Sequence, residues 1–151
     1  MISPNLPSEL QAALARKAEG LSRADAAQRA GEISQTYRSG GSSNRIKTTA
    51  DALAYALARM PGTYAAVAAS LNALMEIDPD FAPQSLLDVG AGPGTATWAA
   101  NEAFASLETF ALLDANVALR DLATALVASQ PRLESLRYNS GDARKMLADA
   151  P

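Results

Sequence analysis

The sequence contains no cysteine and no histidine among its 151 residues. These absences exclude disulfide bonds, thiolate metal ligands, thiol nucleophiles and imidazole general bases within this chain, so no metal site is expected. Aromatic residues make up only 5% of the chain, and much of the 48% apolar content is alanine. Because alanine favours helices and buries little area, we expect closely packed helices.

Long apolar runs are also missing. No run approaches the roughly 18–20 apolar residues that a transmembrane helix needs. The first ten residues, MISPNLPSEL, lack the charged start and apolar core of a secretory signal. Together these absences predict a cytoplasmic protein with no membrane contact.

Charge is unevenly distributed, although the net charge is only −3. Residues 1–61 carry eight basic and five acidic side chains, whereas residues 62–151 carry five basic and eleven acidic ones. This change of sign suggests that the two parts face different partners. Arg38, Arg45 and Lys47 flank the glycine–serine stretch SGGSSN and are candidate RNA-binding residues. The alternative is that these charges belong to ordinary solvated surfaces.

Helix-forming patterns fill residues 1–80, which are expected to form a helical N-terminal segment. Ser8 and Ser22 are placed to cap the first two helices. A third helix starts at Thr49 and is broken by Pro61, after which a fourth follows.

The pattern changes after residue 80, where short apolar runs alternate with helical periodicity. The predicted elements are a strand at 85–89, a helix at 95–104, a strand at 108–113, a helix at 117–128, a strand within 131–140 and the start of a helix at 143–147. Such alternation is typical of a parallel sheet with right-handed crossovers. The fold class is therefore α/β, with residues 81–151 forming the first half, strands 1–3, of a Rossmann-like sheet.

A glycine-rich stretch, LLDVGAGPGTATWAA, follows the first predicted strand. Ligands of a doubly wound sheet bind beyond the carboxyl ends of the strands. Gly90 and Gly92 have no Cβ to block a ligand there, and Gly94 lets the next helix pack closely on the strand. The helix N-terminus adds N–H groups and a partial positive charge.

The acidic residue Asp88 discriminates between two classes of cofactor. Dinucleotide enzymes hold a pyrophosphate with G-x-G-x-x-G, whereas this sequence has G-x-G-x-G with Asp88 two residues before the first glycine. A carboxylate repels a pyrophosphate but attracts an ammonium or a sulfonium. S-adenosylmethionine carries both cations, so the charges favour it over NAD.

Two further acids follow the next two predicted strands. Asp114, in ALLDAN, is placed to accept both ribose hydroxyls, and Asp142, in SGDA, to accept from the adenine amino group. The predicted cofactor-binding residues are Asp88, Gly90, Gly92, Gly94, Asp114 and Asp142. The alternative for each of them is a plain N-cap or turn-forming role.

Three segments together resemble one family: SLLDVGAGPGTATWAA, AYALARMPGTYAAV and ISQTYRSG. They are similar to the bacterial and mitochondrial ribosomal small-subunit methyltransferase-like family, within the class I S-adenosylmethionine-dependent methyltransferases. The glycine motif is shared by all class I methyltransferases, and the Arg-Met-Pro segment is more discriminating. The resemblance covers about residues 6–142 and implies a protein associated with the small ribosomal subunit or its rRNA.

The chain departs from this family in two respects. Some members carry an iron–sulfur cluster on cysteines, which this chain lacks. A class I methyltransferase sheet usually has seven strands, whereas three precede Pro151, so we expect the N-terminal portion of a longer protein. The acceptor pocket would lie in the remainder, and no catalytic residue is assigned. The first strand would then have an unpaired edge, through which self-association is expected.

Two functions remain open on these residues. The first is an S-adenosylmethionine-dependent methyltransferase that acts on, or chaperones, small-subunit rRNA. The alternative is a non-catalytic assembly factor that keeps the cofactor fold as an RNA-binding scaffold. Both keep the same glycine turn, whereas a dehydrogenase is disfavoured by the glycine spacing and by Asp88.

Overall fold

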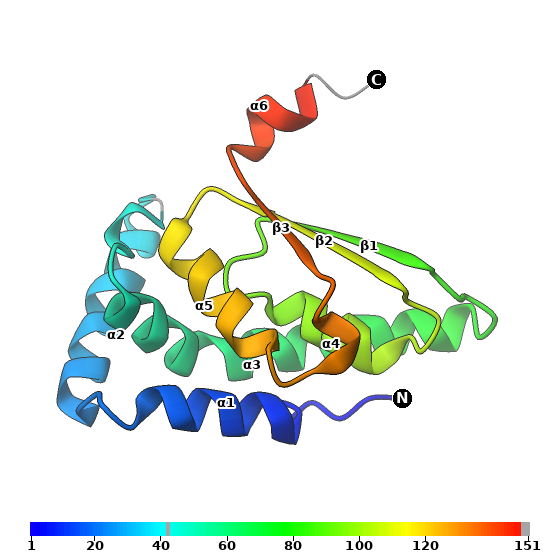
Figure 1. The fold of residues 1–151 in the computed structure, drawn as a ribbon, viewed down its shortest axis with the longest axis horizontal. Helices are drawn as coiled ribbons and strands as arrows, with labels where there is room; N and C mark the ends of the chain where they lie inside the picture. The colour runs from blue at the N-terminus through cyan, green and yellow to red at the C-terminus, as the bar shows by residue number, and fades with distance from the viewer. Residues whose placement is uncertain (42, 149–151) are drawn as a thin grey trace.

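The computed structural model describes residues 1–41 and 43–148, in which helices lie against a three-stranded parallel sheet (Figure 1). The first elements are α1 (Ser8–Ala18), α2 (Arg23–Arg38), the short 3-10 helix η1 (Ser43–Arg45) and α3 (Thr49–Ile77). The remaining ones are β1 (Ser85–Val89), α4 (Thr95–Ala103), β2 (Thr109–Asp114), α5 (Val117–Val127), the 3-10 helix η2 (Pro131–Leu133), β3 (Arg137–Ser140) and α6 (Ala143–Ala148).

The predicted fold class is confirmed, because a helical region precedes three parallel strands joined by helices. One hydrophobic core runs through both parts, from Leu10 in α1 to Leu133 in η2. The division into segments at residue 80 stays an interpretation. Ser42, in the predicted loop, and residues 149–151 of the second segment lie outside the described residues.

The sheet has the strand order β1-β2-β3, with parallel pairing throughout. Phe110 and Leu112 on β2 are buried on one face of the sheet. On the other face, Leu87 and Val89 of β1 are 57% and 45% exposed. In Figure 1, α3, α4 and α5 all lie on the same side of the sheet. The helices therefore cover one face, and among the described strands β1 pairs with β2 alone.

The long helix α3 packs against α1, α2, α4 and α5, and it is continuous over 29 residues. The prediction of two helices broken at Pro61 was wrong. Proline removes one helical hydrogen bond, but Pro61 is on the exposed side of α3. Met60, Tyr64 and Ala68 are buried along the other side. The buried residues before and after Pro61 in the sequence therefore stabilise the helix more than the missing hydrogen bond destabilises it.

Side-chain caps fix where two of the helices begin. Ser22 caps α2 as predicted, and Thr48 forms a capping box with Asp51 at the start of α3. Asp51 also forms a 2.7 Å ion pair with Arg29, which ties α2 to α3. The prediction for Ser8 was wrong, because it is the first residue of α1 and makes no capping bond.

Arg132 closes the C-terminal end of α4 from a distant part of the chain. The last carbonyls of a helix lack intrahelical partners, and a cation there is favourable. The guanidinium donates to the carbonyl oxygens of Asn101 (2.8 Å), Phe104 (3.1 Å), Ala105 (3.3 Å) and Leu107 (3.1 Å). This side chain therefore fixes both the end of α4 and the connection into β2.

We expect Arg132→Gln to lower the free energy of unfolding by about 1.5–3 kcal/mol, the usual range for hydrogen bonds to a charged group. Urea denaturation followed by circular dichroism measures the change. Arg137→Gln, at an exposed position on β3, is the matched control. Equal stability of the two variants would show that the Arg132 contacts contribute nothing measurable.

Candidate functional site

The turn between β1 and α4 requires glycine for its backbone conformation. Gly90, Gly92 and Gly94 have φ angles of 72°, 54° and 84°, which other residues rarely adopt. A Cβ on Gly94 would make only an ordinary contact with the side chain of Leu112, at 3.5 Å, so the φ angle and not a lack of space favours glycine at this position. A Cβ on Gly92 would meet Leu119 at 3.8 Å, whereas one on Gly90 would meet no heavy atom within 4 Å. Open space therefore borders Gly90.

Asp88 belongs to β1, and its half-buried side chain contacts α4. Its Oδ2 accepts a hydrogen bond from the Thr97 hydroxyl at 2.8 Å. Burial raises the pKa of Asp88, the hydrogen bonds from Thr97 lower it, and the carboxylate of Asp114 raises it further. The net effect is a raised pKa, so the ionised carboxylate is held in a site that disfavours its charge. A ligand cation beside it would relieve that cost.

Asp114, at the end of β2, fastens the glycine turn. Its Oδ2 accepts the backbone N–H of Gly92 at 2.9 Å, and its Oδ1 accepts that of Asn116 at 2.8 Å. The register pairs Val89 with Leu113, which brings the ends of β1 and β2 together. A carboxylate oxygen has two acceptor sites, so both oxygens can still accept a ligand hydroxyl.

Tyr138 on β3 belongs to the same site, although no sequence pattern pointed to it. Its hydroxyl donates to the carbonyl oxygen of Gly92 at 2.6 Å. Burial, followed by the nearby carboxylates of Asp114 and Asp88, raises the pKa of Tyr138 well above its ordinary value. The phenol therefore remains a donor. Thr97 was missed for the same reason, since only the packed structure brings it to Asp88.

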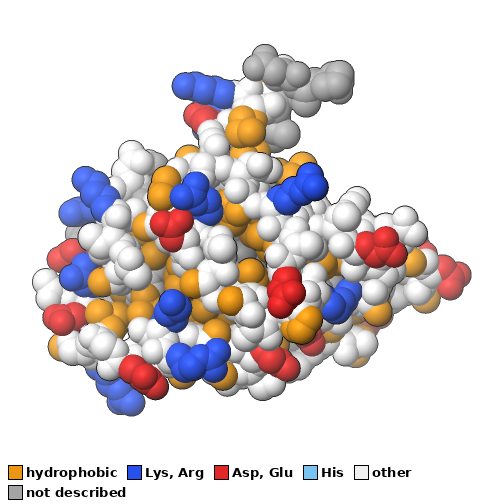
Figure 2. Space-filling model, in the orientation of Figure 1, with side chains coloured by type: hydrophobic (Ala, Val, Ile, Leu, Met, Phe, Trp, Pro, Cys, Tyr) orange, Lys and Arg blue, Asp and Glu red, His pale blue; other side chains and the backbone are white. Residues whose placement is uncertain are grey.

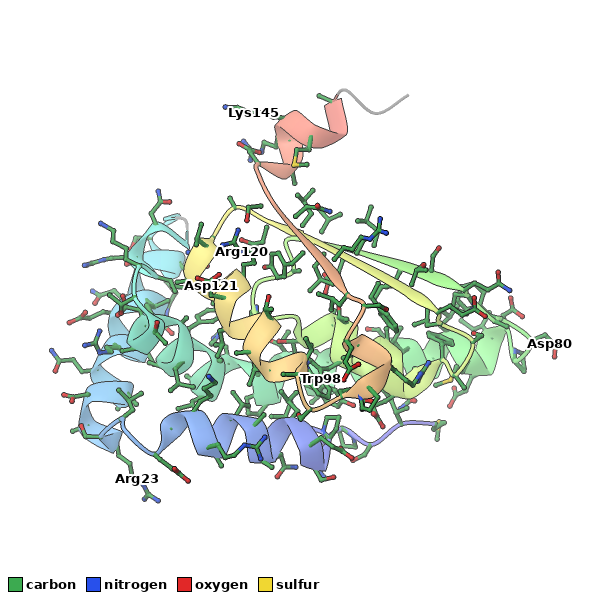
Figure 3. The ribbon with its side chains drawn as sticks, in the orientation of Figure 1. Arg23, Asp80, Trp98, Arg120, Asp121 and Lys145 are labelled. Carbon is green, nitrogen blue, oxygen red and sulfur yellow. The ribbon has the colours of Figure 1, made fainter. Side chains whose placement is uncertain are left out.

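Asp142 follows β3 but is exposed to solvent. Its Oδ1 accepts the backbone N–H of Arg144 at 2.9 Å, in the first turn of α6. This is the capping role left open as the alternative for this residue, and binding of adenine stays a prediction. Arg120 on α5, labelled in Figure 3, donates to the Ser140 hydroxyl at 2.6 Å and so joins α5 to the same end of the sheet.

The predicted RNA-binding residues Arg38, Arg45 and Lys47 all have exposed side chains. Arg45 and Lys47 lie on either side of Ile46, which is buried. The Ile46 carbonyl accepts a hydrogen bond from Asn116 Nδ2 at 2.9 Å, and Asn116 also caps α5. In Figure 2, basic and acidic side chains are interspersed over the left-hand side, where α2 lies, whereas Asp and Glu predominate at the right-hand tip.

Two further kinds of site are missing from residues 1–41 and 43–148. None of the helices there is long and apolar enough to cross a membrane. No group of three or more histidine, cysteine, aspartate or glutamate residues in the described ranges is arranged to hold a metal ion.

Comparison with known proteins gave a family match and a similar human protein. Residues 49–149 match a family model described as mitochondrial small ribosomal subunit Rsm22. The human protein named "Ribosome assembly protein METTL17, mitochondrial" is 37% identical over 76 residues, which are 50% of this chain and 17% of that protein. The resemblance found in the sequence is confirmed. The prediction of a cytoplasmic location is contradicted, because both descriptions are mitochondrial.

Asp88→Asn tests whether the buried carboxylate stabilises the fold. The pKa of Asp88 is higher in the folded protein than in the unfolded chain, so protonation favours folding. The stability gained from the protonated carboxyl is present below about pH 4 and is lost as the pH rises through the pKa of Asp88 in the folded protein. Asparagine keeps an acceptor for Thr97 without the charge. We therefore expect the variant to equal or exceed the wild type in stability at neutral pH and to lose this advantage in acid.

Urea denaturation across the acid-to-neutral range measures this difference. Asp80→Asn, at an exposed position in the loop before β1, is the control for removing one acid (Figure 3). A variant that is much less stable than the wild type at neutral pH would show that the ionised carboxylate stabilises the turn.

Proposed function

The chain belongs to the mitochondrial small ribosomal subunit Rsm22 family, and on this basis we propose that it binds S-adenosylmethionine at the β1–α4 turn and contacts small-subunit rRNA. The observation that carries the cofactor proposal is the left-handed glycine turn, with Asp88 behind it and Asp114 bound to it. The matched human relative is named a ribosome assembly protein, which supports a role beside the ribosome. The chain spans 17% of that relative, so the activity of the whole protein is part of the proposal.

Each proposed cofactor residue has a distinct task. S-adenosylmethionine would supply a methyl group on a sulfonium, and the residues of this chain would bind and orient the molecule. Gly90 leaves open space for it, and Asp88 offers a negative charge to its ammonium group. The remaining acceptor sites of Asp114 suit the ribose hydroxyls. Asp142 would accept from the adenine amino group with the carboxylate oxygen that does not cap α6.

A catalytic protein and a non-catalytic scaffold would both use this site. Methyl transfer is an in-line displacement, in which alignment of the reactants supplies much of the rate. We assign no catalytic residue within the chain. The alternative is therefore a non-catalytic assembly factor that retains the cofactor fold as an RNA-binding scaffold. The name of the human relative, a ribosome assembly protein, supports this alternative.

The RNA contact is proposed for Arg38, Arg45 and Lys47. Ile46 is held beside the cap of α5, so the two basic residues next to it lie near the end of the sheet where the cofactor is proposed to bind. Exposed cations of this kind neutralise backbone phosphates and release counterions. Self-association through the edge of β1 stays a prediction, which the exposed Leu87 and Val89 favour.

The cofactor proposal predicts that the chain binds S-adenosylmethionine and its demethylated product, and does not bind NAD. Isothermal titration calorimetry with the three ligands measures this. Gly92→Val should abolish binding with little change in helix content, because valine is strained at a φ of 54° and shifts the N–H that Asp114 accepts. Gly31→Val, where an added Cβ meets nothing within 4 Å, is the matched control. Tight NAD binding without S-adenosylmethionine binding would refute the assignment.

The RNA proposal predicts a salt-dependent loss on changing Arg38, Arg45 and Lys47 together to serine. Each phosphate contact removed should lower the slope of log affinity against log salt by about 0.7–0.9. Filter binding to a small-subunit rRNA fragment at several salt concentrations measures affinity and slope. The control removes the same charge from exposed positions elsewhere, by serine substitution at Arg16, Lys17 and Arg23. Equal losses in the two triple variants would mean that only net charge matters.

A further inference from the structure

A cavity outside the site described above lies between α2 and α3. Its volume is about 250 Å³, and it is lined by Ser34, Tyr37 and Arg38 of α2 and by Tyr55 and Arg59 of α3. Sites that enclose a whole small molecule usually measure about 300–1,000 Å³. The cavity is therefore suited to one part of a larger ligand.

Aromatic side chains are concentrated in this cavity, although the chain contains few. Two of the four tyrosines line it, with ring centroids 6.1 Å apart and ring planes inclined at 37°. Tyr37 is 42% exposed and Tyr55 is half-buried. The other two have different roles, since Tyr64 is in the core and Tyr138 binds the glycine turn. Rings at this distance contact each other, so a planar base would stack on the exposed side of the pair and not between the two rings.

The charge of the cavity is positive. Arg38 and Arg59 are both exposed, and none of the described residues that line the cavity is acidic. Asp51, one helical turn before Tyr55 on α3, is paired with Arg29 at 2.7 Å. Those two residues line a different cavity together with Asp25, Gln28 and Glu32. The α2–α3 pair thus has an acidic side and a basic aromatic side, and the latter attracts anions.

We propose that this cavity binds one nucleotide of single-stranded RNA, with the base stacked on Tyr37 and Tyr55 and the adjacent phosphates contacting Arg38 and Arg59. Single-stranded RNA is commonly held by stacking on aromatic rings together with basic side chains along the backbone. An acidic peptide would need the two arginines but not the paired tyrosines. The inference rests on the proposed contact with rRNA and extends the basic residues proposed there, since Arg38 belongs to both.

The test uses the whole chain and a single-stranded RNA of about ten nucleotides that carries one 2-aminopurine, a fluorescent base quenched by stacking. The wild type should bind this RNA and quench its fluorescence. Tyr55→Leu should weaken binding about tenfold or more and remove the quenching, with little change in the salt slope. Arg59→Gln should lower both the affinity and the salt slope, the latter by about 0.7. Tyr37→Leu, at a more exposed position, repeats the stacking test if Tyr55→Leu fails to fold.

Phe81→Leu and Arg23→Gln are the matched controls, because both residues are exposed and neither lines the cavity. RNA binding and quenching that survive in both tyrosine variants would overturn the stacking site and leave the wider rRNA proposal intact. Equal affinity for an RNA with an abasic nucleotide, or for polyglutamate, would also overturn it, because charge alone would then explain binding. No RNA binding by the wild type would overturn both RNA proposals, whereas S-adenosylmethionine binding is measured separately.

Discussion

The carboxylate of Asp114 is the contact on which the arrangement of the candidate site depends. It accepts the N–H of Gly92 from one side and that of Asn116 from the other. Asn116 in turn caps α5 and binds the carbonyl of Ile46, in the segment before α3. One strand-end residue therefore links the glycine turn, the following helix and the N-terminal helical region. The hydrophobic core also spans both parts of the chain, because α3 packs against α4 and α5.

The acidic residues at the strand ends differ in burial and in their hydrogen-bond partners. Asp88 is half-buried and has a raised pKa, so its ionised form lowers the stability of the fold. Asp114 is occupied by backbone donors, and exposed Asp142 accepts a backbone N–H in the first turn of α6. A buried charge that opposes folding is typical of a functional position, because a structural role would be filled as well by a neutral side chain.

The basic and acidic surfaces have a common structural origin in the helices of the first half. On one side of the α2–α3 pair Arg29 forms an ion pair with Asp51, and Asp25 and Glu32 keep that side acidic. Arg38 and Arg59 remain exposed on the other side with two tyrosines. The basic first part of the sequence therefore has a charge asymmetry of its own, between two faces of one helix pair. The family is described by its relation to the small ribosomal subunit, and a basic, aromatic face is suited to contact with RNA.

The sequence by itself determined the elements whose signals are local. The strand at Ser85–Val89, the positive-φ glycines after it and the cap at Ser22 follow from short-range periodicity and backbone sterics. Local rules failed at Pro61, because burial against neighbouring helices outweighed its tendency to break a helix. Only the tertiary structure decided which distant side chains reach the turn or end a helix, such as Thr97, Tyr138 and Arg132. It also formed the tyrosine–arginine cavity, since each of the two helices contributes only one tyrosine and one arginine to it. Those contacts depend on the packing and register of elements far apart in sequence, which no short-range pattern encodes.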